Sequence, residues 1–477
     1  MENSTEPHIV ALPMQAEGHI KPMLNLTKFL SHRGHKITFV NSHYNHNRFT
    51  QHTHLPSLPN FHFASITDGL PVDHHPPNDF TTMITPTCRS LVAKDFREFF
   101  SKLLEKKSEW NPPSCIIADG MMTTIALDVA QEFQIPLITF RTYSATATWA
   151  TIYICQIIQE GVMDLQRQED VDKLLASIPV IENLLRDRDL PYIFKFNPGH
   201  FVLDFYVKET IAMTQASALI LNTFDHLEAN AITKLKTIFP KVYTIGPLHT
   251  LLKTHVTSNI SSSLDGHLRK ENRNCITWLD HQNEKSVLYI SFGTVVKLSR
   301  EQLMEFWHGL VNSFKPFLWV IRKDLINGGG GCLGDNVPVE LELATKDRGL
   351  IVDWAPQEDV LSHPAVGGFL THNGWNSTLE CIVEGVPMLC SPVLNDQPIN
   401  CRSVTEQWKI GLDMNGTYDR LNVEKMVRDL IENKIEGLRS SADAIAEMAA
   451  NSVKETGSSY HNIENLMKDV ASMKVRS

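Results

Sequence analysis

The side chains best suited to chemistry gather in one run, residues 354–397. Within this run, an apolar stretch of strand character at 367–371 leads into a turn at His372 and then into a predicted helix over 375–385. A strand that passes into a helix N-terminus through a Gly-containing turn presents free backbone N–H groups and the positive end of the helix dipole. Such a turn suits a phosphate group, and the imidazole of His372 and the hydroxyl of Ser377 add side-chain donors to it.

A carboxylate follows this turn at a useful distance along the chain. Glu380 lies three residues after Ser377, so the two side chains share one face of the predicted helix. A carboxylate can accept hydrogen bonds from two adjacent hydroxyl groups, such as those of a ribose. The run therefore predicts a site for a nucleotide sugar.

Polar groups also occur where other predicted strands end. His19 follows the first predicted strand, and Asp119 ends the apolar strand at 115–119. Because ligands of doubly wound sheets bind at the carboxyl ends of the strands, these groups and His372 are placed as in an active site. An imidazole can take the proton of an attacking hydroxyl group, and a carboxylate can hold that imidazole in one tautomer. For Asp119, the role of a buried helix cap stays open.

The run 354–397 resembles the signature box of plant secondary-product glycosyltransferases, which are UDP-dependent inverting enzymes of the GT-B fold. The residues that match at the family's spacing are Trp354, Ala355, Pro356, Gln357, His372, Gly374, Trp375, Asn376, Ser377, Glu380, Gly385, Pro387, Asp396 and Gln397. The segment 18–22, Gly-His-Ile-Lys-Pro, also matches the GHxxP element that carries the catalytic base in that family.

The resemblance implies a role for each of these groups. His19 is the expected general base, and Asp119 orients its imidazole. Trp354 is expected to stack on the uracil, a contact worth roughly 1–3 kcal/mol by analogy with other base–aromatic stacks. The departing UDP is expected to be stabilised by donors alone, so neither a metal nor another cofactor is expected. The residues that the resemblance assigns to UDP-sugar binding are Thr142, Thr294, Trp354, Ala355, Gln357, His372, Trp375, Asn376, Ser377, Glu380, Asn395, Asp396 and Gln397.

The resemblance also implies the two substrates. A Gln at the position of Gln397 accompanies glucose in this family, so UDP-glucose is the expected donor, although Asp396 and Gln397 could also simply cap the next helix. The segments 45–48 and 67–71 resemble a branch that glucosylates terpenoid, iridoid and cyanohydrin hydroxyls. The expected acceptor is a hydroxyl, or a carboxyl, of a small lipophilic plant metabolite, and the expected product is a β-glucoside.

Four positions depart from the family's pattern. Glu17 replaces a Gln and places a carboxylate beside the expected base, and Asn373 replaces a common Cys. Ser391 replaces a frequent Trp, and Asn395 stands where a small residue is usual. The last two lie close to the expected sugar-binding residues, so they bear on the choice of donor.

Composition limits the class of protein. A chain of 477 residues is long enough for two domains, and 42% hydrophobic with 21% charged residues is typical of a globular protein. The formal net charge of -10 argues against a nucleic-acid partner. Eight Cys without a CxxC pair, and the absence of a signal-peptide pattern or long apolar stretch, lead us to expect a protein of the reduced cytosol with no membrane span. We also expect it to be a monomer.

Strands that alternate with helices predict an α/β protein with two Rossmann-like, doubly wound parallel sheets. We expect an acceptor-binding domain over 1–248, a polar linker over 249–274, and a UDP-sugar-binding domain over 275–443. The resemblance implies that the helices over 444–477 cross back to the first domain.

Other classes of protein are less well supported. The acidic pairs at 170–172 and 187–189 resemble a metal-binding Asp-x-Asp motif, but they lie in charged stretches that indicate solvated helix faces. Residues 74–79 match the HHxxxD motif of some acyltransferases, in which His75 would be the base. No GxGxxG follows the first predicted strand. A catalytically silent relative that only binds the UDP-sugar or a metabolite stays open.

Overall fold

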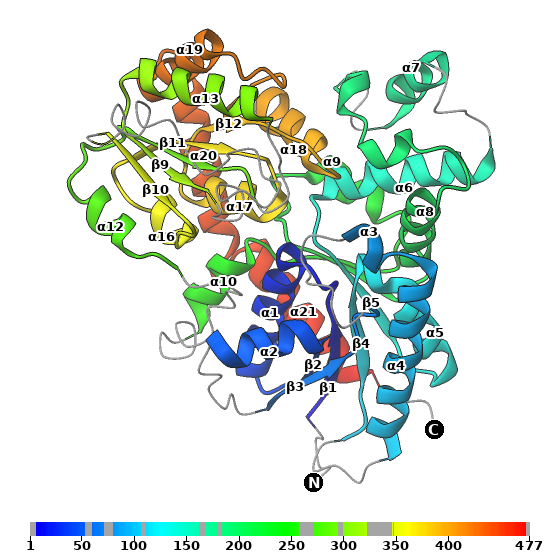
Figure 1. Ribbon diagram of the computed structural model, residues 1–477. Helices are drawn as coiled ribbons and strands as arrows, with labels where there is room; N and C mark the ends of the chain where they lie inside the picture. The colour runs from blue at the N-terminus through cyan, green and yellow to red at the C-terminus, as the bar shows by residue number, and fades with distance from the viewer. Residues whose placement is uncertain are drawn as a thin grey trace. The chain divides into compact units, whose positions relative to one another are not determined.

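Two parallel β-sheets, each in its own compact unit, form the framework of the protein (Figure 1). The computed structural model describes residues 6–52, 60–70, 80–105, 111–161, 168–179, 184–256, 271–293, 299–321, 346 and 348–473. The first unit comprises Met1–Leu268 together with Ala450–Ser477, and the second comprises Arg269–Ala449.

The sheet of the first unit has the strand order β3-β2-β1-β4-β5-β6-β7. Its strands are β1 (His8–Leu12), β2 (Lys36–Ser42), β3 (Phe61–Ile66), β4 (Cys115–Asp119), β5 (Leu137–Arg141), β6 (Ala218–Leu221) and β7 (Val242–Thr244). Every residue of β1, β4 and β5 is buried, as expected for parallel strands that helices cover on both faces. The order reverses between β1 and β4, so the carboxyl ends of these two strands form the switch point where such sheets bind ligands.

Helices cover both faces of this sheet. They are α1 (Glu17–His32), α2 (His43–His52), α3 (Phe80–Met83), α4 (Pro86–Glu105), η1 (Gly120–Met122), α5 (Thr123–Glu132), α6 (Ala145–Glu160), α7 (Gln168–Ser177), η2 (Asp187–Asp189), η3 (Tyr192–Lys195), α8 (Phe201–Met213), α9 (Ala229–Leu235), α10 (Leu248–His255) and α21 (Ser458–Ser472). On β6, Ile220 belongs to the core that α1, α10 and α21 share, whereas Leu219 and Leu221 belong to the core of α6 and α9. This alternation follows from the two-residue period of a strand.

The sheet of the second unit has the strand order β10-β9-β8-β11-β12-β13. Its strands are β8 (Val287–Ser291), β9 (Phe317–Val320), β10 (Gly349–Val352), β11 (Val366–Thr371), β12 (Met388–Cys390) and β13 (Gly411–Asp413). Its helices are α12 (Asn274–Leu279), α13 (Arg300–Ser313), α16 (Gln357–Leu361), α17 (Trp375–Val383), α18 (Gln397–Arg402), the π-helical η5 (Ser403–Gln407), α19 (Arg420–Ile431) and α20 (Leu438–Ser452), the last of which runs into the first unit. The order reverses between β8 and β11, which places the chain after Ser291 and Thr371 at the second switch point.

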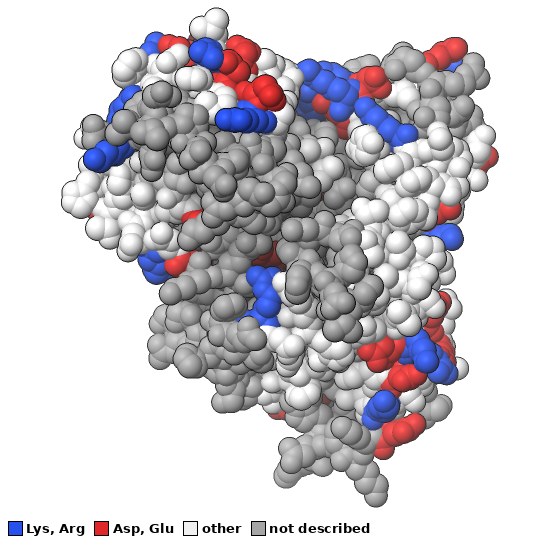
Figure 2. All heavy atoms as spheres, in the orientation of Figure 1, with Lys and Arg blue, Asp and Glu red and all other residues white. Residues whose placement is uncertain are grey.

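Opposite charges are mixed on the outer surface of the second unit. Figure 2 shows blue and red side chains side by side over α13 and α19. Arg420 pairs with Glu305 there, and Lys425 pairs with Asp429 one helical turn away. Within the ranges described above, no helix is both long enough and apolar enough to cross a bilayer.

The predicted fold class, a doubly wound parallel sheet in each domain, is confirmed. The linker predicted over 249–274 differs from the structure at its start, because α10 forms there and buries Leu251 and Leu252 in the core of the first unit. Leu248, Leu251 and Leu252 lie three and four residues apart, an apolar helical face that the polar residues between them obscured. The last described helix, α21, places Ile463 in that same core.

In the second acidic pair, Asp187 is exposed as predicted, but Asp189 differs from its prediction as part of a solvated helix face. The side chain of Asp189 is only 5% exposed, and it accepts hydrogen bonds from the backbone N–H and the Nε of Arg186, each at 2.7 Å. The carboxylate therefore caps η2. The side chains of the pair at 170–172, the HHxxxD segment with His75, and Thr294 lie outside the described residues.

Candidate active site

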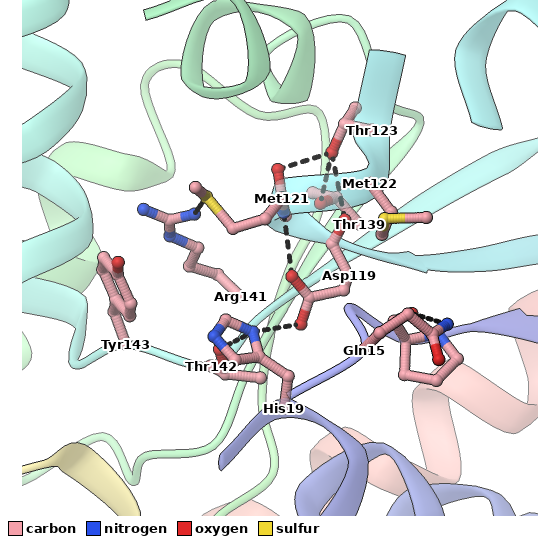
Figure 3. Close-up of polar contacts among 12 residues, drawn as sticks. Gln15, His19, Asp119, Met121, Met122, Thr123, Thr139, Arg141, Thr142 and Tyr143 are labelled. Carbon is pink, nitrogen blue, oxygen red and sulfur yellow. Dashed lines mark hydrogen bonds and ion pairs between the residues drawn. The ribbon is translucent and has the colours of Figure 1, made fainter. Parts of the chain in front are cut away.

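A histidine–carboxylate pair lies at the switch point of the first unit. His19 is in the first turn of α1, directly after β1, and Asp119 is the last residue of β4. Because β1 and β4 are neighbours, the two side chains meet, and His19 Nδ1 lies 2.8 Å from Asp119 Oδ2 (Figure 3). The imidazole is 18% exposed, whereas the carboxylate is 1% exposed, so solvent reaches the histidine but hardly its partner.

Asp119 has a second task in the same place. Its Oδ1 accepts a hydrogen bond from the backbone N–H of Met121 at 2.8 Å, which caps η1. The helix-cap role that the sequence left open for Asp119 thus exists alongside the contact with His19. With one oxygen committed to each partner, the carboxylate has a fixed orientation. The neutral imidazole then carries its hydrogen on Nδ1, and Nε2 keeps the lone pair that a general base needs.

Thr142 is the third member of this cluster. Its Oγ1 lies 3.0 Å from His19 Nδ1, so the turn after β5 also contacts the imidazole. Glu228 holds that turn by accepting the backbone N–H groups of Ala145 and Thr146 at 2.9 and 2.8 Å. Sequence reasoning missed Glu228, because these two backbone partners are more than 80 residues away and no local pattern reveals them.

Arg141 is a further group that the sequence did not single out. It ends β5, is 1% exposed, and its guanidinium lies 3.9 Å from the centre of the Tyr143 ring (Figure 3). Its Nη1 also donates to the sulfur of Met121 at 3.1 Å. These contacts fix the side chain of Arg141 directly before Thr142 in the chain. An arginine at the end of an otherwise apolar strand was the one signal available.

His372 occupies the switch point of the second unit, after β11. Its ring packs so closely against Gly293 and Gly374 that a Cβ at either glycine would lie within 2.7 Å of a ring atom. Burial lowers the pKa of His372 to about 4, while the nearby Ser291 backbone opposes the shift. The imidazole is therefore neutral at pH 7, and its buried Nδ1 has no hydrogen-bond partner among the described residues.

The polar side chains expected at a ribose converge in the second unit. Gln357 Nε2 donates to Ser377 Oγ at 2.9 Å and to Glu380 Oε2 at 2.6 Å. The hydroxyl of Tyr289 on β8 donates to Gln357 Oε1 at 3.3 Å, which sets the orientation of the amide. Glu380 is 4% exposed. Helix α16 and helix α17 thus place three predicted residues in one hydrogen-bonded group.

Two predicted tryptophans lie in different surroundings. Trp354 is partly exposed ahead of the buried Ala355, and its carbonyl accepts the N–H of Asn272 at 2.9 Å. Trp375 is 3% exposed and packs against Trp408 with 6.3 Å between ring centres. As the first residue of α17, followed by Asn376 in the same turn, Trp375 can offer a phosphate its backbone N–H rather than its ring.

The residues predicted for the sugar surround the start of α18. Asp396 does not cap its own helix through its side chain, and its Oδ2 instead accepts from Asn400 Nδ2 at 2.7 Å. Gln397 Oε1 accepts the backbone N–H groups of Val393 and Leu394 at 2.9 and 2.8 Å. Asn395 has a positive φ of 52°, which Asn tolerates better than most residues.

The other departures from the family's pattern also have structural partners. Ser391 is buried, and its Oγ lies 2.6 Å from the hydroxyl of Tyr418, so a tyrosine ring packs beside this small residue. Asn373 is fully buried with a φ of 60°. Asn adopts this left-handed conformation more readily than Cys, the residue that is common at this position in the family.

A scan against protein-family models matches residues 8–438 to UDP-glucoronosyl and UDP-glucosyl transferase. The chain is 42% identical to a 7-deoxyloganetic acid glucosyltransferase of Catharanthus roseus, over 99% of both chains. It is 40% identical to a mogroside I-A1 synthase of Siraitia grosvenorii, over 97% of this chain and 88% of that one. Among solved structures, Os79 from O. sativa in complex with UDP aligns with a TM-score of 0.81 at 26% identity, over 97% of this chain and 100% of that chain.

Proposed function

This chain belongs to the UDP-glucoronosyl and UDP-glucosyl transferase family and is a UDP-glycosyltransferase, and we propose that it transfers glucose from UDP-glucose to a small terpenoid-type acceptor with inversion. The family resemblance predicted from the sequence is thereby confirmed. The observation that carries the proposed mechanism is the 2.8 Å contact between His19 Nδ1 and Asp119 Oδ2, which leaves Nε2 as the basic atom.

In the proposed reaction, His19 Nε2 takes the proton of the acceptor hydroxyl as its oxygen forms a bond to the anomeric carbon of glucose. The bond from that carbon to the UDP oxygen breaks, and UDP leaves with the bonding electrons. Asp119 stabilises the imidazolium that forms, as the acid of a catalytic triad does. Such general-base catalysis contributes typically about 10²–10⁴-fold to the rate.

The donor would bind to groups of the second unit. We assign the uracil to Trp354 and the ribose to Glu380, supported by the hydrogen bonds that hold Glu380 to Gln357. The diphosphate is assigned to His372 and the N-terminus of α17, with Asn376 and Ser377. Because His372 is neutral, this end of the site attracts the diphosphate through the helix dipole and N–H donors.

We assign the hydroxyl groups of glucose to Asp396 and Gln397, with Thr142 as a further donor or acceptor. Gln397 commits its Oε1 to the backbone, so it can offer its Nε2 hydrogens to a sugar hydroxyl, whereas Asp396 can accept from one. An adjacent pair of hydroxyl groups, one accepting and one donating, matches this arrangement. Neither role needs a metal ion.

The proposed acceptor class is supported by the names of the relatives. One relative is named for 7-deoxyloganetic acid, an iridoid, and another for a mogroside, a terpenoid. No disulfide links the seven described cysteines, all of which are buried, and this is compatible with a reducing compartment; we propose the cytosol. We further propose that the protein is a monomer.

The test is release of UDP from UDP-glucose in the presence of a panel of terpenoid, iridoid and flavonoid alcohols, with mass spectrometry of the products. We expect acceptor-dependent release and a product heavier by one hexose, with the β configuration at the anomeric carbon. Turnover confined to flavonoids would refute the terpenoid acceptor. The absence of acceptor-dependent release with every UDP-sugar would favour a binding protein without activity.

A further inference from the structure

Asn400 is a fully buried residue of α18 that no sequence motif singled out. Its Nδ2 donates two hydrogen bonds, one to the carbonyl of Asn373 at 3.0 Å and one to Asp396 Oδ2 at 2.7 Å. Both hydrogens of the amide nitrogen are therefore directed at acceptors, which fixes the orientation of the side chain. The two acceptors belong to segments 23 residues apart that we have assigned to different parts of the donor.

The first bond holds the turn that we assign to the diphosphate. Asn373 has a left-handed backbone, and its N–H donates to Thr371 Oγ1 at 3.1 Å. Its Nδ2 donates to the sulfur of Cys390 at 3.2 Å. The bond from Asn400 to its carbonyl adds a third anchor. This turn lies between His372 and the N-terminus of α17, so its backbone conformation sets the orientation of both.

The second bond holds the carboxylate that we assign to glucose. Asp396 lies one helical turn before Asn400, and its carboxylate accepts from the Asn400 side chain instead of capping the helix. A hydrogen bond to a charged group is stronger than a hydrogen bond between neutral groups. It holds the carboxylate in one rotamer, so the position of Asp396 depends on Asn400.

We propose that Asn400 is a positioning residue of the donor site, whose single amide joins the diphosphate-binding turn to the sugar-binding carboxylate of Asp396. This inference rests on the proposed function, because it takes Asp396 to bind the sugar. It implies that one residue supports the binding of both the glucose and the diphosphate of UDP-glucose. Losing Asn400 weakens the hold on the sugar as well as the hold on the diphosphate.

The test compares the affinities of the full-length protein for UDP and for UDP-glucose by calorimetry, in the wild type and in Asn400→Ala, Asn400→Ser and Asn400→Asp. For Asn400→Ala, we expect UDP to bind roughly 3- to 10-fold and UDP-glucose roughly 10- to 50-fold more weakly, from one neutral and one charge-assisted bond. Asn400→Asp keeps the shape but turns an oxygen toward Asp396 and the Asn373 carbonyl. It should therefore bind UDP-glucose more weakly than the alanine variant.

Asn462 of α21 provides the matched control, because its Nδ2 also donates two bonds, to the carbonyl and Oγ1 of Thr244 at 3.1 and 2.8 Å in the first unit. Asn462→Ala should leave both affinities within twofold of the wild type. If Asn400→Asp does not fold, the affinities for UDP and for UDP-glucose are compared in the serine variant instead.

Three results would overturn the inference: unchanged UDP-glucose binding in the Asn400 variants, an equal loss for UDP and UDP-glucose, or a milder effect of Asp than of Ala. The last would indicate that only the volume of the side chain matters. A wild type that fails to bind UDP-glucose would instead refute the proposed function. The two failures are thus distinguishable.

Discussion

The pair of bonds that Asp119 makes gives a sharp prediction for Asp119→Asn. In the wild type, Oδ1 accepts from the N–H of Met121 and Oδ2 faces His19 Nδ1. The asparagine amide has only one oxygen, so it can satisfy one of these partners. If that oxygen faced His19, an NH2 group would face the buried N–H of Met121, which would lose its acceptor at a cost of about 1–3 kcal/mol. The amide therefore turns its oxygen to Met121.

This orientation points the NH2 group at His19 Nδ1, which must then accept a hydrogen bond. The proton of the neutral imidazole moves to Nε2, the atom proposed to act as the base. By analogy with the same change in a catalytic triad, kcat should fall roughly 10⁴-fold, which corresponds to about 5 kcal/mol of transition-state stabilisation. The assay is acceptor-dependent UDP release at saturating UDP-glucose and acceptor.

The comparison with Asp119→Ala separates catalysis from folding. The alanine variant leaves the Met121 N–H without its cap and should lose about 1–3 kcal/mol in the free energy of unfolding. The asparagine variant keeps that cap, so it should be more stable than the alanine variant and comparably inactive. Asp119→Asn with more than a tenth of wild-type kcat would refute the reasoning about the tautomer.

Two further predictions concern the second unit. His372 has a lowered folded-state pKa, so its neutral form stabilises the fold fully above the ordinary value of 6.5, and that stability is lost as the pH falls toward about 4. Between pH 6.5 and 4, the free energy of unfolding in urea should fall by roughly 3 kcal/mol less for His372→Gln than for the wild type. Burial also lowers the pKa values of His8 and His35, but these two residues contribute equally to both proteins. Parallel curves of stability against pH would contradict the prediction. Gln397→Glu keeps an oxygen for the N–H groups of Val393 and Leu394 but replaces the NH2 donor, so UDP affinity should stay within about threefold while UDP-glucose binds roughly tenfold more weakly. Calorimetry with both ligands checks this, and equal binding of UDP-glucose to Gln397→Glu and wild type would remove the donor role of that amide.

The positions of the main polar groups could be predicted from the sequence for a simple reason. Buried parallel strands are recognised in the sequence as apolar runs, and their carboxyl ends lie at one edge of the sheet. His19 and Asp119 could therefore be predicted to lie close together. The helix that begins at Trp375 was likewise indicated by the small polar residues after a Gly.

The contacts that hold these groups depend on partners far along the chain, which no local pattern reveals. Glu228 supports the Thr142 turn from more than 80 residues away, and Asn400 reaches Asn373 from 27 residues away. The sequence also could not show that Trp375 packs its ring against Trp408. Tertiary packing decides whether the Trp375 ring is exposed or buried, because the same helix is compatible with either.

We propose that His19 acts as the base of a UDP-dependent transfer. The most direct test measures acceptor-dependent UDP release by the wild type and by His19→Ala at saturating substrates, with UDP affinity measured alongside. We expect a loss of roughly 10²–10⁴-fold in kcat with UDP affinity unchanged. A His19→Ala variant that turns over within threefold of the wild type would contradict it.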